Sequence, residues 1–230
     1  MRRRWPRPRG PRRPTFSINL SLPLPPDSSA LDPLLQVWER GRPWLRCHHV
    51  AFGATEFNPG LGRGRFHPFS APDGGVVPSL YGASTLDGAL SETIFHNVPV
   101  RGPACRVRLS SLRPIVISTV AAAKDLVLAQ LHGHGLSRLG VSREELIDSD
   151  ADGYERTALW AQALHGCGAE VDGLVWVSRL HDTSLALVFF GDRVFRRDLT
   201  VVEPPIPLAA GPGLERVQTA AEQKGITLVE

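Results

Sequence analysis

The sequence predicts an α+β fold with a mainly antiparallel sheet and flanking helices. Short segments with the alternating or apolar pattern of strands are interleaved with segments of helical periodicity, without a regular strand–helix alternation. A hairpin is predicted from two apolar segments, GLVWVS and SLALVFFGD, which only RLHDT separates. With 230 residues and 42% hydrophobic content, the chain is long enough for one globular domain.

The first 33 residues predict a disordered tail and linker. Seven arginines and several prolines precede residue 15, and SLPLPPDSSALDP continues the proline-rich composition. Removing these seven from the 26 basic residues leaves 19 against 23 acidic ones, so the rest of the chain is mildly acidic. The tail is therefore either a basic arm that binds nucleic-acid phosphates or a solvated leader, and the folded body has no basic character.

Order is expected from residue 34. A short helix or turn is predicted for 34–41, LLQVWERG, and a strand for 44–52, WLRCHHVAF, which places Arg46 on one strand face. A glycine-rich turn, NPGLGRGRFHPF, comes next. A short strand is then predicted for 76–81, VVPSLY, and its Pro78 favours a sheet edge or a bulge.

Helical spacing begins after this strand. Apolar residues recur at helical intervals over 86–94 behind Ser84 or Thr85 as the cap, which predicts a helix of about three turns. Strands are predicted for CRVRLS, half buried, and PIVIS, fully buried, and residues 125–131 have a helical pattern. Ser142 and Glu145 have the spacing of a capping box, and YERTALWAQALHG is the clearest helical pattern in the chain.

The cysteines and hydropathy limit the class of protein. Cys47, Cys105 and Cys167 form no CxxC pair and are expected to be reduced and mostly buried. Neighbouring strand residues point to opposite faces, so Cys47 and the histidines beside it do not predict a metal site. No apolar run has the length of a membrane span, and we expect a cytoplasmic protein.

Four residues around the glycine-rich turn could form a binding pocket. Arg65 and Arg46 could hold a pyrophosphate, whose oxygens match the planar guanidinium, and Tyr81 could stack on a flat heterocycle. Glu92 could stabilise a developing positive charge if it lies in a cleft. Each also has a structural explanation: a salt-bridge arginine, a solvent-facing strand arginine, a buried tyrosine and a surface glutamate.

Ser178 ends a predicted strand and is followed by His181 and Asp182. This cluster resembles a Ser-His-Asp triad only by adjacency, and no GxSxG motif is present. A serine that binds a ribose hydroxyl or a phosphate is an equally good interpretation.

Together and in this order, these motifs resemble the RES domain, named for its arginine, glutamate and serine. The resemblance covers about residues 44–194, and it is carried by WLRCHH, GRGRFHPF, LYGASTLDGALSETIFH, YERTALWAQALHGCGAEVDGLVWVS and SRLHDTSLALVFFGDRV. It implies a catalytic domain over residues 34–200, with a split sheet similar to that of ADP-ribosyltransferase toxins, and a C-terminal extension over 201–230. It also implies Arg65, Glu92 and Ser178 as catalytic residues, with Arg46, Arg65 and Tyr81 binding NAD as the substrate and no further cofactor.

The resemblance implies a bacterial toxin that degrades NAD by cleaving the nicotinamide–ribose bond, through hydrolysis or phosphorolysis. Two alternatives remain: mono-ADP-ribosyl transfer to a protein, and a non-catalytic nucleic-acid-binding or interaction module that uses the basic tail. The expected partners are NAD and an Xre-like antitoxin that covers the cleft entrance near Arg65 and Tyr81, within a complex that can be homo-oligomeric. Nucleic acid would be contacted through the antitoxin.

Overall fold

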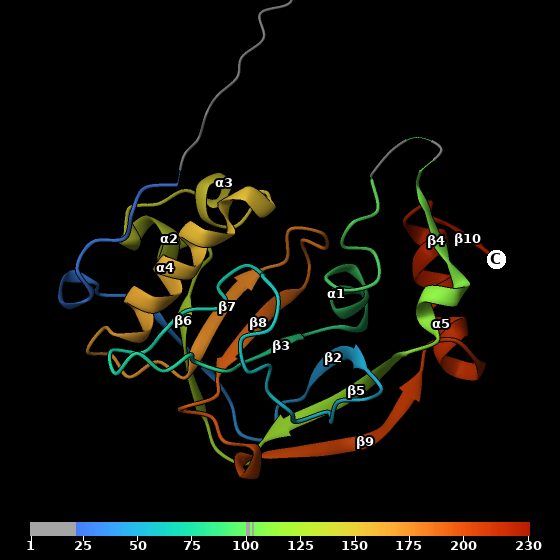
Figure 1. The fold of residues 1–230 in the computed structure, drawn as a ribbon, viewed down its shortest axis with the longest axis horizontal. Helices are drawn as coiled ribbons and strands as arrows, with labels where there is room; N and C mark the ends of the chain where they lie inside the picture. The colour runs from blue at the N-terminus through green and yellow to red at the C-terminus, as the bar shows by residue number, and fades with distance from the viewer. Residues whose placement is uncertain (1–21, 100–101, 103) are drawn as a thin grey trace, which may run out of the picture.

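The computed structural model describes residues 22–99, 102 and 104–230. Its main element is an eight-stranded sheet in the order β1-β6-β7-β8-β3-β2-β5-β9 (Figure 1). The neighbouring strands run antiparallel except β6 and β7, which are parallel. The strand bounds are β1 Leu35–Trp38, β2 Trp44–His49, β3 Ser79–Ala83, β5 Ile115–Ala122, β6 Leu126–Gln130, β7 Gly173–Val177, β8 Leu185–Phe190 and β9 Leu199–Pro207.

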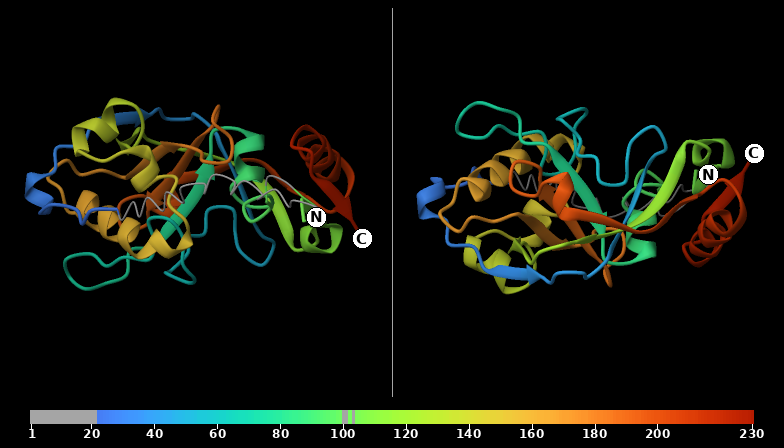
Figure 2. Two further views of the ribbon diagram at one scale, coloured as in Figure 1. Left: turned by 90° about the horizontal axis from the view of Figure 1, so that it is seen from above. Right: turned by 90° about the horizontal axis from the view of Figure 1, so that it is seen from below.

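The helices are gathered at the two ends of the sheet. One end carries α2, α3 and α4, whereas α1 and α5 lie toward the other, as the views from above and below also show (Figure 2). A small parallel pair, β4 and β10, lies beside α5. The bounds are α1 Leu86–Ser91, α2 His134–Leu139, α3 Arg143–Leu146, α4 Tyr154–His165, α5 Gly211–Gln223, β4 Arg106–Arg108 and β10 Thr227–Val229, with 3-10 turns at Ser28–Ala30, Leu109–Leu112, Ala151–Gly153 and Arg196–Asp198. The predicted α+β class with a mainly antiparallel sheet is confirmed.

The main sheet is pinched between β2 and β3. In the described residues these strands are paired through one residue pair, Leu45 with Ala83, whereas β2 pairs with β5 along its whole length. Gly82 lies at this junction, where an added Cβ would come within 2.4 Å of the Trp44 ring. The two halves of the sheet therefore diverge here and leave room for side chains between them.

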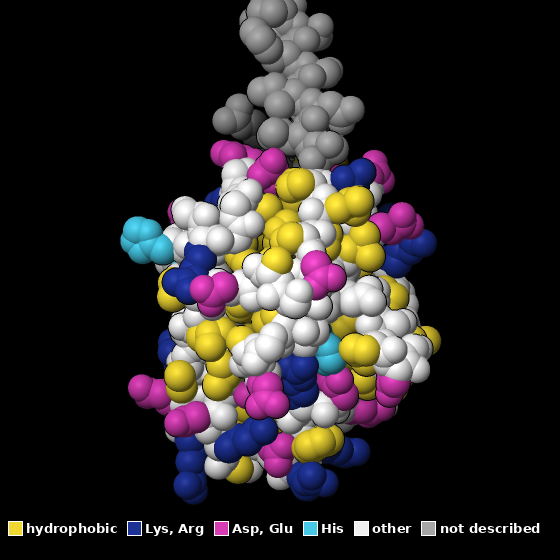
Figure 3. Space-filling view, turned by 90° about the vertical axis from the view of Figure 1, so that its left-hand side faces the viewer, with side chains coloured by type: hydrophobic (Ala, Val, Ile, Leu, Met, Phe, Trp, Pro, Cys, Tyr) yellow, Lys and Arg dark blue, Asp and Glu magenta, His cyan; other side chains and the backbone are white. Residues whose placement is uncertain are grey.

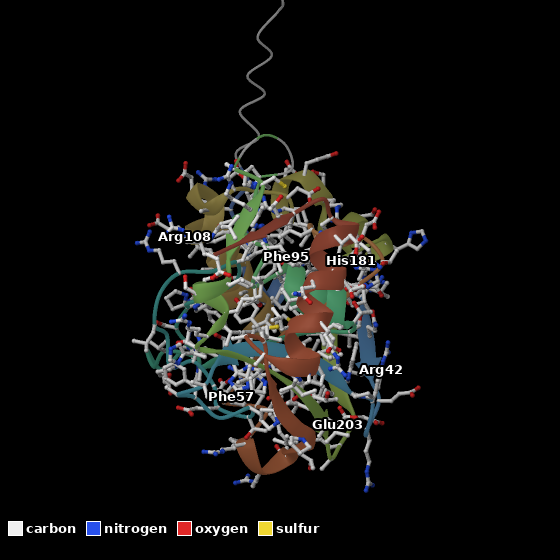
Figure 4. The ribbon with its side chains drawn as sticks, turned by 90° about the vertical axis from the view of Figure 1, so that its right-hand side faces the viewer. Arg42, Phe57, Phe95, Arg108, His181 and Glu203 are labelled. Atoms are coloured by element: carbon white, nitrogen blue, oxygen red, sulfur yellow. The ribbon has the colours of Figure 1, made fainter. Side chains whose placement is uncertain are left out.

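Three hydrophobic clusters stabilise the described fold, and the second of them spans both halves of the sheet. One packs α4 against β7 and β8 around Trp160 and Trp176, and another lies on the other face around Trp38 and Phe189. The third packs α1 and α5 against the β2–β5 half, and Phe95 lies inside it (Figure 4). No helix in the described ranges is long and apolar enough to cross a membrane.

Two predicted helices are strands in the structure. Residues 35–38 form β1 and residues 126–130 form β6, which pair with each other in antiparallel register. Leucine and alanine favour helices locally, but Leu126, Leu128 and Ala129 are fully buried in the hydrophobic clusters on the faces of the sheet. The gain from pairing and burial therefore overrides the local propensity of these segments.

The helix after β3 is shorter than predicted. Thr85 caps α1 by accepting from the Gly88 N–H, but the helix ends at Ser91. The Leu90 carbonyl then accepts from the N–H groups of Thr93, Ile94 and Phe95, so the chain tightens into turns around it. The predicted edge or bulge at Pro78 is also wrong, because β3 begins after this proline and lies inside the sheet.

The other predicted elements are present, although the strand expected for 44–52 ends at His49 and the one expected for 76–81 spans Ser79–Ala83. The strands at WLRCHH, CRVRLS and PIVIS are present as β2, β4 and β5, and α4 and the β7–β8 hairpin match their predicted segments. The capping box has both of its hydrogen bonds, one in each direction between Ser142 and Glu145.

The two ends of the described chain are packed against the domain. Residues 1–21 of the expected disordered tail lie outside the described residues, but the linker that follows is ordered: Leu22 is buried, and its carbonyl accepts from Arg156 of α4. The expected boundary at residue 200 falls inside β9, which pairs with β5. The C-terminal residues are thus part of the same core and not a separate unit.

Candidate active site

A cavity of about 360 Å³ lies at the pinch between β2 and β3. Four of the five predicted site residues line it: Arg46 from β2, Arg65 from the glycine-rich turn, Tyr81 from β3 and Glu92 at the end of α1. The remaining lining residues are Leu45, Cys47, Arg63, Gly64, His67, Gly82, Ala83, Ala89, Thr93, His96, Asn97, Tyr154, Trp176 and Ala186. Residues far apart in sequence therefore meet where the sheet loses its regular pairing.

Arg65 is held by the segment that follows α3. Its Nη1 donates to the Leu146 carbonyl at 3.2 Å and to Ser149 Oγ at 2.8 Å, and its Nη2 donates to the Ser149 carbonyl at 2.9 Å. Burial lowers the pKa of Arg65 from its ordinary value, although the group stays charged at neutral pH. These three bonds leave Nε and one Nη2 hydrogen free to bind a ligand.

Arg46 lies on the other side of the pinch and is half-buried. Its Nη1 donates to the carbonyls of Ala54 and Glu56 at 3.0 and 2.8 Å. Burial lowers the pKa of Arg46 to about 10. As with Arg65, its partners are neutral oxygens: within the described residues neither guanidinium has a carboxylate oxygen within 4.0 Å.

The two arginines make the cavity attractive to an anion. A charge that is buried or half-buried, and hydrogen-bonded to carbonyls but not neutralised by a carboxylate, is unfavourable unless a counter-charge binds. Two such groups lining one cavity match a ligand with two negative charges, such as a pyrophosphate, which guanidinium groups can bind with paired hydrogen bonds.

Tyr81 holds the glycine-rich turn through its hydroxyl. The hydroxyl donates to the Arg65 carbonyl and lies 3.1 Å from His67 Nδ1, and burial raises the pKa of Tyr81 above its ordinary value. Gly64 is required here, because an added Cβ would lie 2.7 Å from the His67 ring. Tyr81 therefore positions the backbone of Arg65 while its ring lines the cavity.

The turn also contains a strained residue. Phe66 has a φ of 71°, in the left-handed region that residues with a Cβ rarely adopt. Its ring is fully buried and packs edge-on against Trp176 at 5.1 Å. The buried ring holds this backbone conformation, which lies between the two site residues Arg65 and His67.

Glu92 is the carboxylate at the site. It occupies the C-cap of α1, and its Oε1 accepts from Ser178 Oγ at 2.5 Å. The short approach of α1 to the hairpin depends on Gly88, whose added Cβ would lie 2.7 Å from Ser184. Glu92 thus reaches the cavity with one oxygen fixed by a buried serine.

Ser178 is fully buried and does not line the cavity. Its hydroxyl donates to Glu92 and accepts from the N–H groups of Leu180 and His181, each at 3.1 Å. The hydroxyl has therefore no hydrogen left for a ribose or a phosphate, which was one of its predicted roles. In this geometry Ser178 positions Glu92, while His181 turns its ring toward Ser184, so no Ser-His-Asp triad is formed.

One segment connects the arginine side of the site with the serine side. Arg143, at the start of α3, donates to the carbonyls of Val177 and Ser178 at 3.1 and 3.2 Å and pairs with Asp148 at 3.2 Å. The same segment supplies the oxygens that hold Arg65. Residues 143–149 therefore brace both halves of the site, which the sequence did not predict.

Tyr154 is a further site residue that was missed. Its ring lies 5.3 Å from the Arg65 guanidinium and lines the cavity at the start of α4. The chain has two tyrosines, and both line this cavity, so their rarity was a signal in the sequence.

No group of three or more His, Cys, Asp or Glu side chains that could hold a metal ion occurs in the part of the chain that the structure describes. Cys47 has a free thiol whose pKa is raised to about 12 by burial, and the His48 ring bonds to Ser118. Of these two residues, Cys47 lines the cavity and His48 does not.

The comparisons with known proteins agree with this architecture. A solved structure described as the crystal structure of the M.tuberculosis MbcT-MbcA toxin-antitoxin complex is similar in fold, with a TM-score of 0.55 and 15% sequence identity, over 80% of this chain and 92% of that one. No individual curated protein matches significantly. The sequence profile of the RES domain matches residues 38–209, well over half of the chain. The chain therefore belongs to the RES domain family.

Proposed function

We propose that this protein cleaves NAD at the bond between nicotinamide and ribose. The observation that carries the proposal is the charge arrangement in one cavity. The buried Arg65 and the half-buried Arg46 have no carboxylate partner within the described residues, and a buried serine holds the carboxylate of Glu92. NAD combines the groups that this arrangement fits, since its pyrophosphate is dianionic and its nicotinamide ribose becomes positive during cleavage.

The residues have separate roles in this reaction. Arg65 and Arg46 bind the pyrophosphate and so fix the nicotinamide ribose in the cavity. As the glycosidic bond breaks, its electron pair moves to the nicotinamide nitrogen, which becomes neutral, and positive charge develops on the ribose. Glu92 stabilises that charge, and Ser178 keeps the carboxylate in place.

An acceptor then completes the reaction. Water gives ADP-ribose and a proton, phosphate gives a phosphorylated ADP-ribose, and a protein side chain gives a modified protein. Binding of the pyrophosphate and stabilisation of the ribose are common to all three outcomes, so Glu92 and Arg65 are needed whichever acceptor is used.

The family and the similar fold support a proposal for the biological role. The similar structure is a toxin–antitoxin complex. We propose that this chain is likewise a toxin, acting in the cytoplasm and held inactive by an Xre-like antitoxin that covers the cavity entrance near Arg65 and Tyr81. A complex of the two proteins in which this cavity stays open to NAD would contradict the proposed mode of inhibition.

The test is nicotinamide release from NAD by the purified protein. Glu92→Gln and Arg65→Ala should lower the rate by about a hundred- to a thousandfold, since each removes a charge that acts in the transition state or on the substrate. Matched controls are Glu203→Gln and Arg108→Ala, which alter exposed charges at the periphery (Figure 4).

Circular dichroism must show that all four variants are folded. Normal release by the folded E92Q variant would refute the role of Glu92. Labelled NAD with phosphate, or with cell extract, then distinguishes the acceptor.

A further inference from the structure

A second cavity of about 300 Å³ adjoins the first one. Arg63, His67 and Tyr154 line both cavities, so the two cavities adjoin at a constriction formed by these three residues. The second cavity lies on the side of α4, away from Glu92 and Ser178, and none of the predicted site residues lines it.

The walls of the second cavity are mostly apolar. One wall is the face of α4 that carries Ala158 and Leu159, and the opposite wall is formed by Pro68 and Phe69. Leu159 is 41% exposed, and the α4 end of the molecule shows hydrophobic side chains between charged ones (Figure 3). Ser70 and Gln162 add polar groups at the margin. A slot of this kind suits a flat heterocycle with polar edges, such as a nucleobase.

The size of each cavity points to half of a dinucleotide. Cavities for drug-sized ligands span roughly 300–1,000 Å³, and each of the two is near the lower end of that range. The first cavity has the arginines and the carboxylate, which fit a pyrophosphate and a ribose. A second nucleoside joined to that pyrophosphate must extend beyond the constriction at Tyr154.

A weak salt bridge lies at this constriction. Arg63 pairs with Glu155 of α4 at 2.9 Å, and both side chains are 73% exposed. Exposed pairs of this kind contribute only about 0–1 kcal/mol. Arg63 also lies between two glycines, Gly62 and Gly64, so it can exchange Glu155 for a phosphate without distorting a regular element.

We propose that the second cavity binds the adenosine half of the dinucleotide and that Arg63 contacts the phosphate beside it. This inference rests on the proposed NAD cleavage. It makes the enzyme selective for dinucleotides, because the adenosine half supplies binding energy that a mononucleotide lacks. Nicotinamide mononucleotide carries the same scissile bond and should be a poor substrate.

The test combines a binding assay with a kinetic assay. Ser70→Trp should fill the second cavity, and Leu159→Ala should remove one wall; Leu35→Ala is the matched control, because Leu35 is 42% exposed and lines neither cavity. By calorimetry, S70W should bind ADP-ribose about tenfold or more weakly, L159A a few-fold more weakly, and L35A like the wild type. Binding of ribose 5-phosphate should be unchanged in all three.

In the kinetic assay, S70W should lower kcat/KM for NAD by a similar factor and leave cleavage of the mononucleotide unchanged. Folded S70W and L159A that bind ADP-ribose like the wild type would overturn the inference, as would equal kcat/KM for NAD and the mononucleotide in the wild type. If the wild type releases no nicotinamide, the proposed function fails. The calorimetry then still decides the subsite, since weakened ADP-ribose binding in S70W supports it and no binding by the wild type overturns it.

Discussion

Replacing Ser178 with alanine removes one hydroxyl that makes three hydrogen bonds. Two of them, from the N–H groups of Leu180 and His181, are worth about 0.5–1.5 kcal/mol each, and the bond to the Glu92 carboxylate is worth about 1.5–3 kcal/mol. Leu180 and His181 are half-buried, so water can partly replace the lost partner of their N–H groups, and we expect a loss of about 3 kcal/mol in the free energy of unfolding. For a domain of this size that lowers Tm by about 6–12 °C.

The same chain contains a matched control. Ser91 is also fully buried and precedes Glu92, but its hydroxyl has no hydrogen-bond partner in the described structure. Ser91→Ala should leave Tm within about 2 °C, because it removes a buried polar group that nothing satisfies. Differential scanning calorimetry on the two variants separates the loss of a hydroxyl from the loss of its bonds.

The activity of the two variants tests the positioning role. At a temperature where both are folded, S178A should release nicotinamide about a hundredfold more slowly than the wild type, since Glu92 loses its fixed orientation, while S91A stays near the wild type. Equal Tm values for S178A and S91A, or full activity of folded S178A, would refute the account of Ser178.

Three further predictions concern the bracing segment, the histidines and the C-terminus. Arg143→Met should lower nicotinamide release about tenfold or more in a folded protein, whereas Arg216→Met, an exposed arginine on α5, should not. Burial lowers the pKa of four histidines, so as the pH falls the unfolded chain binds protons before the folded protein does. Tm should therefore be steady above about pH 6.5 and fall below it, and the fall should be less steep in the His67→Gln variant. These histidines are His48, His67, His132 and His165. Deleting residues 210–230 should prevent folding, because α5 covers Leu90 and Leu208 in the third cluster. The loss would be seen as a missing near-UV circular dichroism spectrum. A stable, active truncated protein would show that α5 is dispensable.

The parts of the fold that could be predicted are those in which local propensity and burial in the core favour the same structure. The α4 helix and the β7–β8 hairpin have both the right periodicity and the right flanking residues, and the α3 capping box is complete within four residues. In β1 and β6 local propensity and burial favour different structures. Their leucines favour a helix locally, and the partner strand that decides the outcome lies about ninety residues away in the sequence.

The site divides in the same way. Residue type and spacing made Arg46, Arg65, Tyr81 and Glu92 candidates, and the resemblance to the RES domain selected them. The structure brings all four around one cavity. The role of Ser178 could not be predicted, because it depends on which donors and acceptors surround a hydroxyl. The role of Arg143 could not be predicted for the same reason, since its partners are backbone carbonyls, which have no sequence signature.

The position of the site explains why sequence patterns identify candidate site residues but do not predict the geometry of the site. A regular sheet has no room for a dinucleotide, so the ladder between β2 and β3 must open, and the packing of Trp44 takes over from the missing hydrogen bonds. Trp44 is fully buried and packs on Phe189 at 4.7 Å, yet its ring N–H has no partner in the described structure. An unsatisfied buried donor is unfavourable, and it is tolerated where the two halves of the sheet separate. Gly82 lines the cavity in which the proposed chemistry takes place, and Trp44 and the strained Phe66 each adjoin a lining residue in the chain. The departures from regular structure are therefore found at this site.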